Sequence, residues 1–477
     1  MPFVAGVDTS TQSTKVEIRD LDSGEVVASG AGSHPSVTPP VSEQDPATWM
    51  DAFDQAWSAA LDSIPGRPGS GAVAAISIGG QQHGMVALDA DDRPVHPAKL
   101  WNDTESAPDA GWLRAQLASG DDTDGAAAWA EAVGSVPLAA FTVTKLSWLH
   151  RTHPDAWNRM VRVLLPHDYL THRLTGEYTT DRGDASGTGY WSPSAGEYRW
   201  DILAIVDADR DWHDVVPTVL GPLDVAGEWN SMAVATGTGD NMAAALGLGL
   251  APGDAVLSIG TSGTAFSVSP TPTIDPTGAV AGFADATGCF LPLVCTSNAA
   301  KVLDAFRRLL GVDHAEFDRL ALAADGEVPV LLPYLDGERT PDRPDATGIL
   351  GSLRSDVTRE QLARAAVNGV ACGLLDALDA LRSHCDVAGS ISLVGGGARS
   401  TALRAVIAGL VGVPVVVSEA AEAVATGAAV QAAAVLAGSD HAAVQQRWGL
   451  GASGGAIDGV DSGNLRERYA ALRDARL

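Results

Sequence analysis

A carboxylate in the middle of the chain stands where it could act as a general base. Asp240 and Asn241 follow the turn Gly237-Thr-Gly239 and open an alanine-rich segment with helical character. An Asp at this point could cap the helix by accepting the unpaired amides of its first turn. It could also take a proton from a substrate, because glycines let a ligand approach the backbone closely. For an isolated Asp the cap is the more frequent role, so the other segments must decide.

Two predicted hairpins rich in hydroxyl groups could bind an anion such as phosphate. The first joins strands expected at residues 3–7 and 15–19 through Asp8-Thr-Ser-Thr-Gln-Ser-Thr14. The second joins strands expected at 255–259 and 265–268 through Gly260-Thr-Ser-Gly-Thr264. Hydroxyls and turn amides offer many donors, although a polar turn facing water has the same composition. Because each half of the chain carries one such hairpin near its start, we expect two lobes around a shared cleft.

Two other segments carry groups suited to a sugar. A strand expected at residues 74–78 ends in Gly79-Gly-Gln-Gln-His-Gly84, which places Gln82 and His83 in a glycine-flanked loop. In Leu100-Trp-Asn-Asp-Thr104, Trp101 stands beside three polar side chains. A loop His bonded to a backbone carbonyl, and a buried Trp next to a turn, explain the same residues without a ligand.

A glycine turn in the second half could bind a nucleotide. A strand expected at residues 391–394 ends in Gly395-Gly-Gly-Ala-Arg-Ser400, and a helix is expected at 402–411. Amides and the helix dipole at such a turn favour negative charge, and close strand–helix packing is the alternative explanation. A small-residue helix at 422–436 is expected to pack against this turn. The Walker-type phosphate loop is missing, since no Lys follows a loop of that form.

Composition limits the fold class and the partners. The 477 residues, 45% hydrophobic, suffice for two or three domains. Helical patterns at 126–133, 145–150 and 168–174 alternate with strands, which indicates an α/β fold. The net charge of −28 argues against binding nucleic acid or an anionic membrane. No signal peptide and no apolar run of ~20 residues is visible, and the four cysteines lack metal or redox spacing, so we expect a cytoplasmic protein.

Phosphoryl transfer from ATP to a sugar accounts for these segments together. The two hairpins would hold the phosphates, and the turn at 395–400 would hold the adenosine. Asp8 would bind Mg²⁺, which prefers carboxylate and phosphate oxygens. Asp240 would take the proton of a sugar hydroxyl as it attacks the γ-phosphorus, a reaction that asks the protein mainly for positioning and charge neutralisation.

Over essentially its whole length the sequence resembles the FGGY family of carbohydrate kinases. The motifs that carry the resemblance occur in the family's order. They are Gly6-Val-Asp-Thr-Ser-Thr-Gln-Ser-Thr-Lys15, Gly80-Gln-Gln-His-Gly84, Leu100-Trp-Asn-Asp-Thr104, Asp184-Ala-Ser-Gly-Thr188, Gly237-Thr-Gly-Asp-Asn241, Gly260-Thr-Ser-Gly-Thr264, Pro333-Tyr-Leu-Asp-Gly-Glu-Arg-Thr-Pro341 and Gly395-Gly-Gly-Ala-Arg-Ser400. Thr238 departs from the family's usual form, which has glycine at that point.

The resemblance implies an α/β fold of two actin-like (ribonuclease H-like) lobes with an ATP cleft between them. Residues 1–239 would form the sugar-binding lobe and residues 240–477 the nucleotide-binding lobe, in a protein that forms a homodimer. The implied reaction is ATP- and Mg²⁺-dependent phosphorylation of D-xylulose to the 5-phosphate. The implied site residues are Asp240 for catalysis; Gln82, His83, Trp101, Asp240 and Asn241 for sugar; Thr11, Gln12, Lys15, Gly260, Thr261, Gly396, Gly397 and Ala398 for nucleotide; and Asp8 and Asp240 for metal.

Three alternatives stay open at this point. The chain could phosphorylate another ketose or a polyol, such as ribulose or ribitol. It could be a non-catalytic actin-like protein that binds ATP, which would not need His83 and Asp240 to face one pocket. It could also be a regulatory sensor that binds sugar without turnover.

Overall fold

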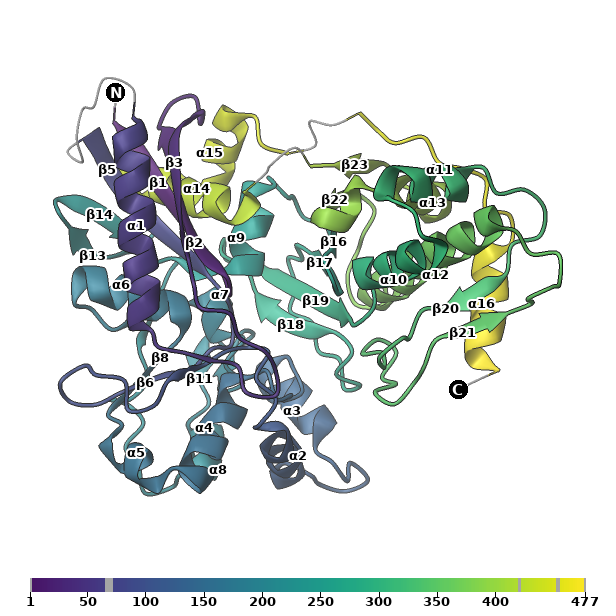
Figure 1. Ribbon diagram of the computed structural model, residues 1–477. Coiled ribbons are helices and arrows are strands. Elements are labelled where there is room, and N and C mark those ends of the chain that lie inside the picture. Colours follow the sequence, from purple (N-terminus) through teal and green to yellow (C-terminus); the bar gives the residue numbers. More distant parts are fainter. Residues whose placement is uncertain (1, 65–71, 419–421, 452–454, 476–477) are drawn as a thin grey trace.

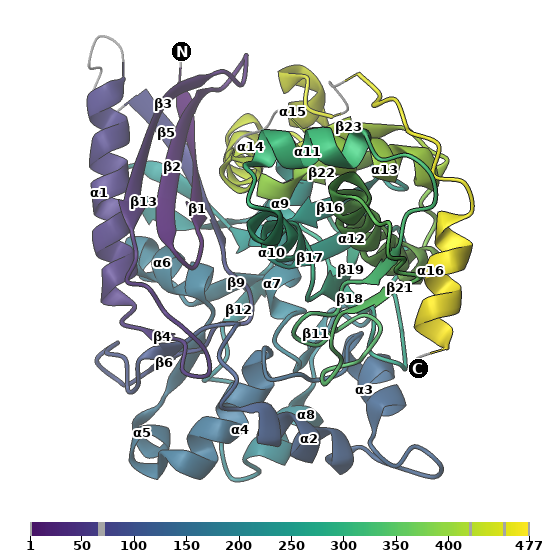
Figure 2. The same ribbon diagram turned by 45° about the vertical axis from the view of Figure 1, so that its right-hand side comes forward.

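The computed structural model describes residues 2–64, 72–418, 422–451 and 455–475. Figure 1 shows two lobes, each built around its own β-sheet, and Figure 2 shows the same lobes from a second direction. We call them the first and second lobe in chain order. Within the described ranges, no helix is both long and apolar enough to cross a membrane.

The first lobe is built on a mixed sheet in which β1 is central. Strand β1 pairs antiparallel with β2 and parallel with β5, and β5 pairs parallel with β14. The sheet order is β13 (Val225–Trp229), β14 (Met232–Ala235), β5 (Val73–Gly80), β1 (Phe3–Thr9), β2 (Ser13–Asp20) and β3 (Val26–Ser33), with β15 (Thr238–Gly239) also paired to β5.

Helices cover both faces of this sheet. Because both faces of β1 are buried, its residues are nearly all apolar. Helices α1 (Ala47–Ser63) and α6 (Pro166–Thr175) lie over one face, where Ala5 and Val7 join a core with Phe53. Helix α14 (Ala423–Ala437) covers the other face, where Val4 packs with Ala429 and Val430.

The expectation that the helix near 422–436 packs against the turn at 395–400 was wrong. Helix α14 instead returns to the first lobe and packs on β1, β5 and α9 (Asp240–Gly247). Its small residues explain the choice, because they permit backbone contact: a Cβ at Gly6 would lie 1.9 Å from the Ala425 carbonyl oxygen, and one at Gly427 would lie 1.8 Å from that of Ala243. The division after residue 239 stays a prediction.

An outer group of helices and short strands extends the first lobe below the sheet in Figure 1. The end of β9 and the short helix α7 belong to this group. The elements are α2 (Ala107–Gln116), α3 (Ala126–Val133), α4 (Thr142–Thr152), α5 (Pro154–Arg159), α7 (Arg182–Ala185), α8 (Trp200–Val206), β4 (Glu43–Gln44), β6 (Val86–Leu88), β7 (Ala98–Lys99), β8 (Arg162–Leu164), β9 (Thr179–Asp181), β10 (Trp191–Ser192), β11 (Glu197–Tyr198) and β12 (Thr218–Leu220).

The second lobe has a six-stranded sheet with the long helix α12 at the centre of its core. The sheet order is β18 (Ala281–Ala284), β19 (Phe290–Thr296), β17 (Gly263–Ser267), β16 (Ala255–Ile259), β22 (Ile391–Val394) and β23 (Val415–Val417). The remaining elements are α10 (Ala300–Leu310), α11 (His314–Leu322), α12 (Arg359–Arg382), α13 (Thr401–Val411), α15 (His441–Trp448, packed on α14), α16 (Leu465–Asp474), β20 (Val330–Leu332), β21 (Ile349–Gly351) and a 3-10 helix (Gly396–Arg399).

Candidate active site

Strand pairing brings Asp240 beside the loop that carries Gln82 and His83. Asp240 is the first residue of α9, and the preceding β15 pairs with the end of β5 at Gly79 and Gly80. A Cβ at Gly239 would lie 2.7 Å from the Gln82 side chain. The turn before Asp240 therefore needs glycine so that the two segments can touch.

The amide of Asn241 joins these two segments. Its Nδ2 donates to Asp240 Oδ1 and to Gln82 Oε1, both at 2.9 Å, and its backbone N–H also donates to Asp240 Oδ1 at 2.8 Å. The N-cap position of α9 is Gly239. Burial raises the pKa of Asp240 to about 7, and the charge of Asp8 adds to the increase. A carboxyl group with this pKa is suited to accept a proton near neutral pH.

Asp8, at the end of β1, is a second carboxylate with a raised pKa. Burial raises it to about 7, against the lowering effect of Lys15. The residue is 8% exposed, and its Oδ1 is buried with no hydrogen-bond partner among the described residues. Lys15 itself is paired with Glu422 at 2.7 Å. An unpartnered carboxylate oxygen near another carboxylate fits a divalent cation, which would stabilise the ionised form of both.

His83 is held rigidly and is neutral. Its φ is 65°, its ring Nδ1 lies 2.7 Å from the Gly187 carbonyl oxygen, and the rings of Phe141 and Phe283 lie 4.8 and 5.5 Å away. Because a carbonyl only accepts, Nδ1 must donate, which leaves Nε2 as an acceptor. Burial lowers the pKa of His83 to about 3. The ring can therefore accept a hydrogen bond from a ligand hydroxyl.

A buried polar network lies behind the turn that carries Asp240. His167 contacts Asp184 at 2.7 Å and Asp168 at 3.2 Å. Burial alone would lower the pKa of His167, but these carboxylates and Asp181 outweigh it and raise the pKa to about 9. Thr238, which departs from the family's usual glycine, donates to Asp181 at 2.7 Å. Its hydroxyl thus connects the turn before Asp240 with the network.

The first hairpin and Trp101 line one cavity of about 460 Å³ in the first lobe. The hairpin contributes Thr11, Gln12 and Lys15 to its lining, and Trp101, which is 41% exposed, completes it next to Thr11. The structure thus places the expected sugar residue Trp101 beside the expected phosphate residues, while Asn241 connects Asp240 with Gln82, the chain neighbour of His83.

The second lobe has a cavity of about 900 Å³ at the ends of β16 and β22. The hairpin residues Gly260 and Thr261 and the glycine-turn residues Gly396 and Gly397 line it, as expected for one nucleotide pocket. Ala398 is buried and is not part of the lining. Helices α10 and α11 supply the apolar wall through Leu303, Phe317 and Leu322.

The hairpin β18–β19 of the second lobe rests on the first lobe next to His83. Arg182 Nη1 donates to the Cys289 carbonyl at 2.6 Å, and the Ala284 N–H donates to Ser186 Oγ at 2.9 Å. Phe283 of this hairpin contacts the His83 ring. Both lobes therefore form the surroundings of His83.

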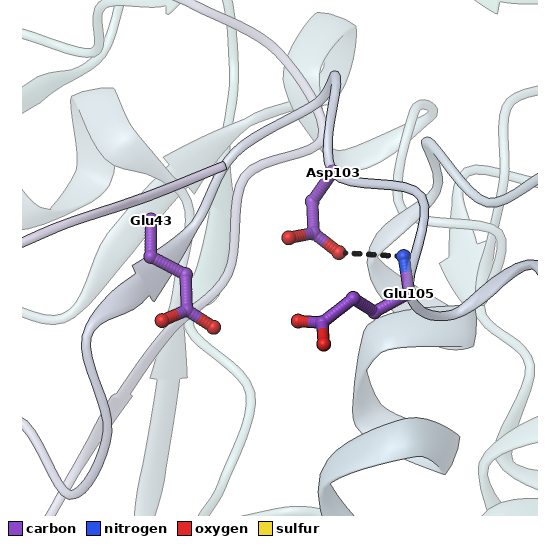
Figure 3. Close-up of side chains that lie close together, drawn as sticks. All are labelled: Glu43, Asp103 and Glu105. Carbon is purple, nitrogen blue, oxygen red and sulfur yellow. Dashed lines mark hydrogen bonds between the residues drawn. The ribbon is translucent and has the colours of Figure 1, made fainter. Parts of the chain in front are cut away.

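Three carboxylates lie close together, two of them on the turn that follows Trp101 in the chain (Figure 3). Among the described residues, Glu43, Asp103 and Glu105 are the group whose spacing would suit a metal ion. The Nζ of Lys99, which is fully buried, lies 2.9, 3.0 and 2.7 Å from them. The ammonium group therefore takes the place that a cation would occupy and fixes the turn that presents Trp101.

Several residues of the site were missed by the sequence analysis. Gln81 belongs to a motif that was noticed, but only its neighbours were selected. His167, Asp181 and Phe283 come from separate elements and have no local pattern that could have identified them. Asp184 lies in a recognised motif without an expected role.

The comparisons with known proteins agree with the arrangement of the two lobes. The N-terminal domain model of the FGGY family of carbohydrate kinases matches residues 3–247, and the C-terminal domain model matches residues 255–436. The chain belongs to the FGGY family of carbohydrate kinases. It has the two-lobed actin-like (ribonuclease H-like) fold of that family and is a carbohydrate kinase, acting on a sugar with ATP as the second substrate.

Three similar proteins are each described as a xylulose kinase. A xylulose kinase of Streptomyces coelicolor is 48% identical, over 99% of this chain and 96% of its own length. A xylulose kinase of Haemophilus influenzae is 34% identical, over 90% of this chain and 89% of its own length. The crystal structure of xylulose kinase from Bifidobacterium adolescentis, 40% identical, superimposes with a TM-score of 0.89 and 99% coverage of both chains.

Proposed function

We propose that this FGGY kinase phosphorylates D-xylulose at its terminal hydroxyl, giving D-xylulose 5-phosphate and ADP. The relatives named as xylulose kinases support the choice of sugar. The observation that carries the proposal is the hydrogen-bonded group of Asp240, Asn241 and Gln82, with His83 next to Gln82 in the chain. It combines a carboxyl group with a pKa of about 7 and an acceptor nitrogen suited to a sugar hydroxyl.

The steps follow from the side chains. The His83 Nε2 accepts a hydrogen bond from one hydroxyl of the ketose and so orients it. The ionised Asp240 accepts the proton of the terminal hydroxyl while that oxygen attacks the γ-phosphorus. The bond to the β-phosphate oxygen breaks, and ADP leaves with the electron pair. Asn241 holds Asp240 in position through its two hydrogen bonds to Oδ1.

The nucleotide would span the two cavities. Thr11, Gln12 and Lys15 on the first hairpin, and Gly260 and Thr261 on the second, would bind the phosphates. Gly396 and Gly397 would border the adenosine, with Ala398 behind them. Asp8, together with Asp240, would hold Mg²⁺, which supplies positive charge to the phosphates when bound.

A coupled assay of ADP release tests this proposal. The purified chain is assayed with D-xylulose, D-ribulose, ribitol, xylitol and glycerol at saturating Mg-ATP, and Asp240→Asn is the matched inactive variant. We expect D-xylulose to give the highest kcat/KM by at least about tenfold, a difference of roughly 1.4 kcal/mol in transition-state binding. A higher value for another sugar would overturn the sugar assignment, and ATP binding without turnover of any sugar would favour a non-catalytic protein.

A further inference from the structure

The hydroxyl of Thr11 makes two hydrogen bonds that connect the phosphate hairpin with both expected sugar segments. Trp101 Nε1 lies 3.0 Å from Thr11 Oγ1, and Thr11 Oγ1 lies 3.1 Å from Gln81 Oε1. An indole N–H can only donate, and a carbonyl oxygen can only accept. The hydroxyl therefore accepts from Trp101 and donates to Gln81, so the direction of this Trp101–Thr11–Gln81 relay is fixed.

The relay continues to the candidate base. Gln81 is 2% exposed and its backbone N–H donates to the Thr9 carbonyl at 3.0 Å, so its position is set by β1. Its neighbour Gln82 accepts from Asn241, which donates to Asp240. Three hydrogen bonds of about 3 Å, together with the peptide bond between Gln81 and Gln82, thus connect the hairpin tip with Asp240.

The backbone of the hairpin tip is held by other groups. Gln44 Nε2 donates to the Thr11 carbonyl at 3.1 Å, and Trp49 Nε1 fixes the Gln44 side chain at 2.7 Å. Loss of the Thr11 hydroxyl would therefore leave the hairpin backbone in place. Removal of this hydroxyl can therefore interrupt the relay without changing the backbone of the phosphate loop.

We propose that Thr11 is a positioning residue that couples the binding of sugar and of nucleotide. The inference rests on the proposed function, since it takes the sugar at Trp101 and Gln82 and the phosphates at the hairpin. A sugar that fixes Trp101 and the Gln81–Gln82 pair also fixes the Thr11 hydroxyl that connects them with the phosphate loop. The entropy cost of fixing this loop is then smaller when the nucleotide binds. Linkage requires the effect to be reciprocal, because the coupling free energy is shared by both ligands.

Isothermal titration tests this coupling directly. The affinity for a non-hydrolysable ATP analogue with Mg²⁺ is measured with and without saturating D-xylulose, and the ratio of the two dissociation constants is the coupling factor. We expect a factor of about 10 in the unmodified chain, within the range of known allosteric couplings. Thr11→Val, which keeps the shape but loses the hydroxyl, should bring the factor to within about twofold of one, while Thr11→Ser should keep it.

A double-mutant cycle separates the relay from a merely structural effect. Trp101→Phe keeps the ring and removes the N–H, so it should reduce the coupling as Thr11→Val does, and the double variant should lose no more than either single variant. The inference would be overturned if Thr11→Val kept the full coupling factor or if Thr11→Ser lost as much of it as Thr11→Val. Additive losses of coupling in the double variant would also overturn it, and so would an unmodified chain in which sugar and nucleotide bind independently. If Thr11→Val fails to fold, Trp101→Phe alone decides. A failure of the proposed function looks different, because the unmodified chain would then not turn over D-xylulose.

Discussion

Asn241 and Gln82 are joined by a hydrogen bond of 2.9 Å between the Asn241 amide nitrogen and the Gln82 amide oxygen. The same nitrogen donates to Asp240, so one side chain links α9 with the loop that carries Gln82 and His83. The orientation of the candidate base therefore depends on the loop that is expected to contact the sugar.

Replacement of Asp240 by Asn should remove the general base with little change of shape. We expect kcat to fall by roughly 10²–10⁴, the usual contribution of a positioned base, while the affinity for the ATP analogue changes by less than about threefold. Fixed-time assays of ADP release measure kcat, and calorimetric titration measures the affinity for the ATP analogue. Asp54→Asn, at an exposed position on α1, is the control, and near-normal turnover in Asp240→Asn would reject the role.

The same substitution should stabilise the fold in a pH-dependent way. The pKa of Asp240 is raised from 3.8 to about 7, so the folded state holds the proton more tightly than the unfolded state between these values. The wild type therefore loses stability as pH rises through this window. In EDTA at pH 8, Asp240→Asn should melt roughly 2–5 °C higher than the wild type, and the difference should vanish near pH 4. A lower melting temperature at pH 8 would contradict the raised pKa.

The sequence predicted the elements whose signals are local. The hairpins around residues 8–14 and 260–264 and the strand–glycine turn–helix at 391–411 were found with small changes in bounds, because alternating apolar residues and glycines specify them directly. The partner of α14 was not predictable. Its small residues indicate close packing, but its own sequence does not identify the sheet on which it packs.

The buried network behind Asp240 shows the same limit for the site. His167, Asp181 and Asp184 come from α6, β9 and α7, and only the folded chain brings them together. Thr238 looked like a departure from the family pattern, and its meaning became visible only through its bond to Asp181. Spacing along a chain cannot report contacts of this kind.

His83 should set sugar affinity without acting as an acid or base. Its pKa of about 3 keeps it neutral, so the sugar KM should show no inflection from His83 between pH 5.5 and 8. His83→Gln should raise the sugar KM roughly tenfold through lost hydrogen bonds and leave the ATP KM within about twofold. His150→Gln, which loses a similar bond to the Val206 carbonyl outside the site, should leave both constants unchanged. A larger effect on ATP than on sugar would contradict this assignment.

Removal of the Lys99 charge should create a binding site for a divalent cation. Lys99→Met leaves Glu43, Asp103 and Glu105 around a space without positive charge, so the variant should melt several degrees lower than the wild type. Millimolar Ca²⁺ should restore much of the loss in Lys99→Met and have no effect on the wild type. Lys301→Met, which breaks a pair with the single carboxylate of Asp336, is the control. Equal responses of all three proteins to Ca²⁺ would refute the prediction.

His167→Gln should destabilise the protein strongly, because it leaves neighbouring buried carboxylates without their cation. We expect a loss of roughly 3–5 kcal/mol in urea unfolding near pH 6. Since the pKa of His167 is raised to about 9, its contribution is complete below about pH 6.5 and is lost as pH rises through 9, so the gap between variant and wild type should narrow there. His172→Gln on the same helix should cost much less. A gap that is constant up to pH 10 would mean that His167 acts through packing alone.

The return of α14 to the first lobe has a consequence for synthesis on the ribosome. One face of β1 is covered by residues that are translated more than 400 positions later, and Gly6 touches the Ala425 backbone. When the strands of the first sheet have emerged from the ribosome, this apolar surface stays exposed until nearly the whole chain has been translated. Fragments that end before α14 should therefore bind chaperones or precipitate, whereas addition of α14 as a separate peptide should keep them soluble.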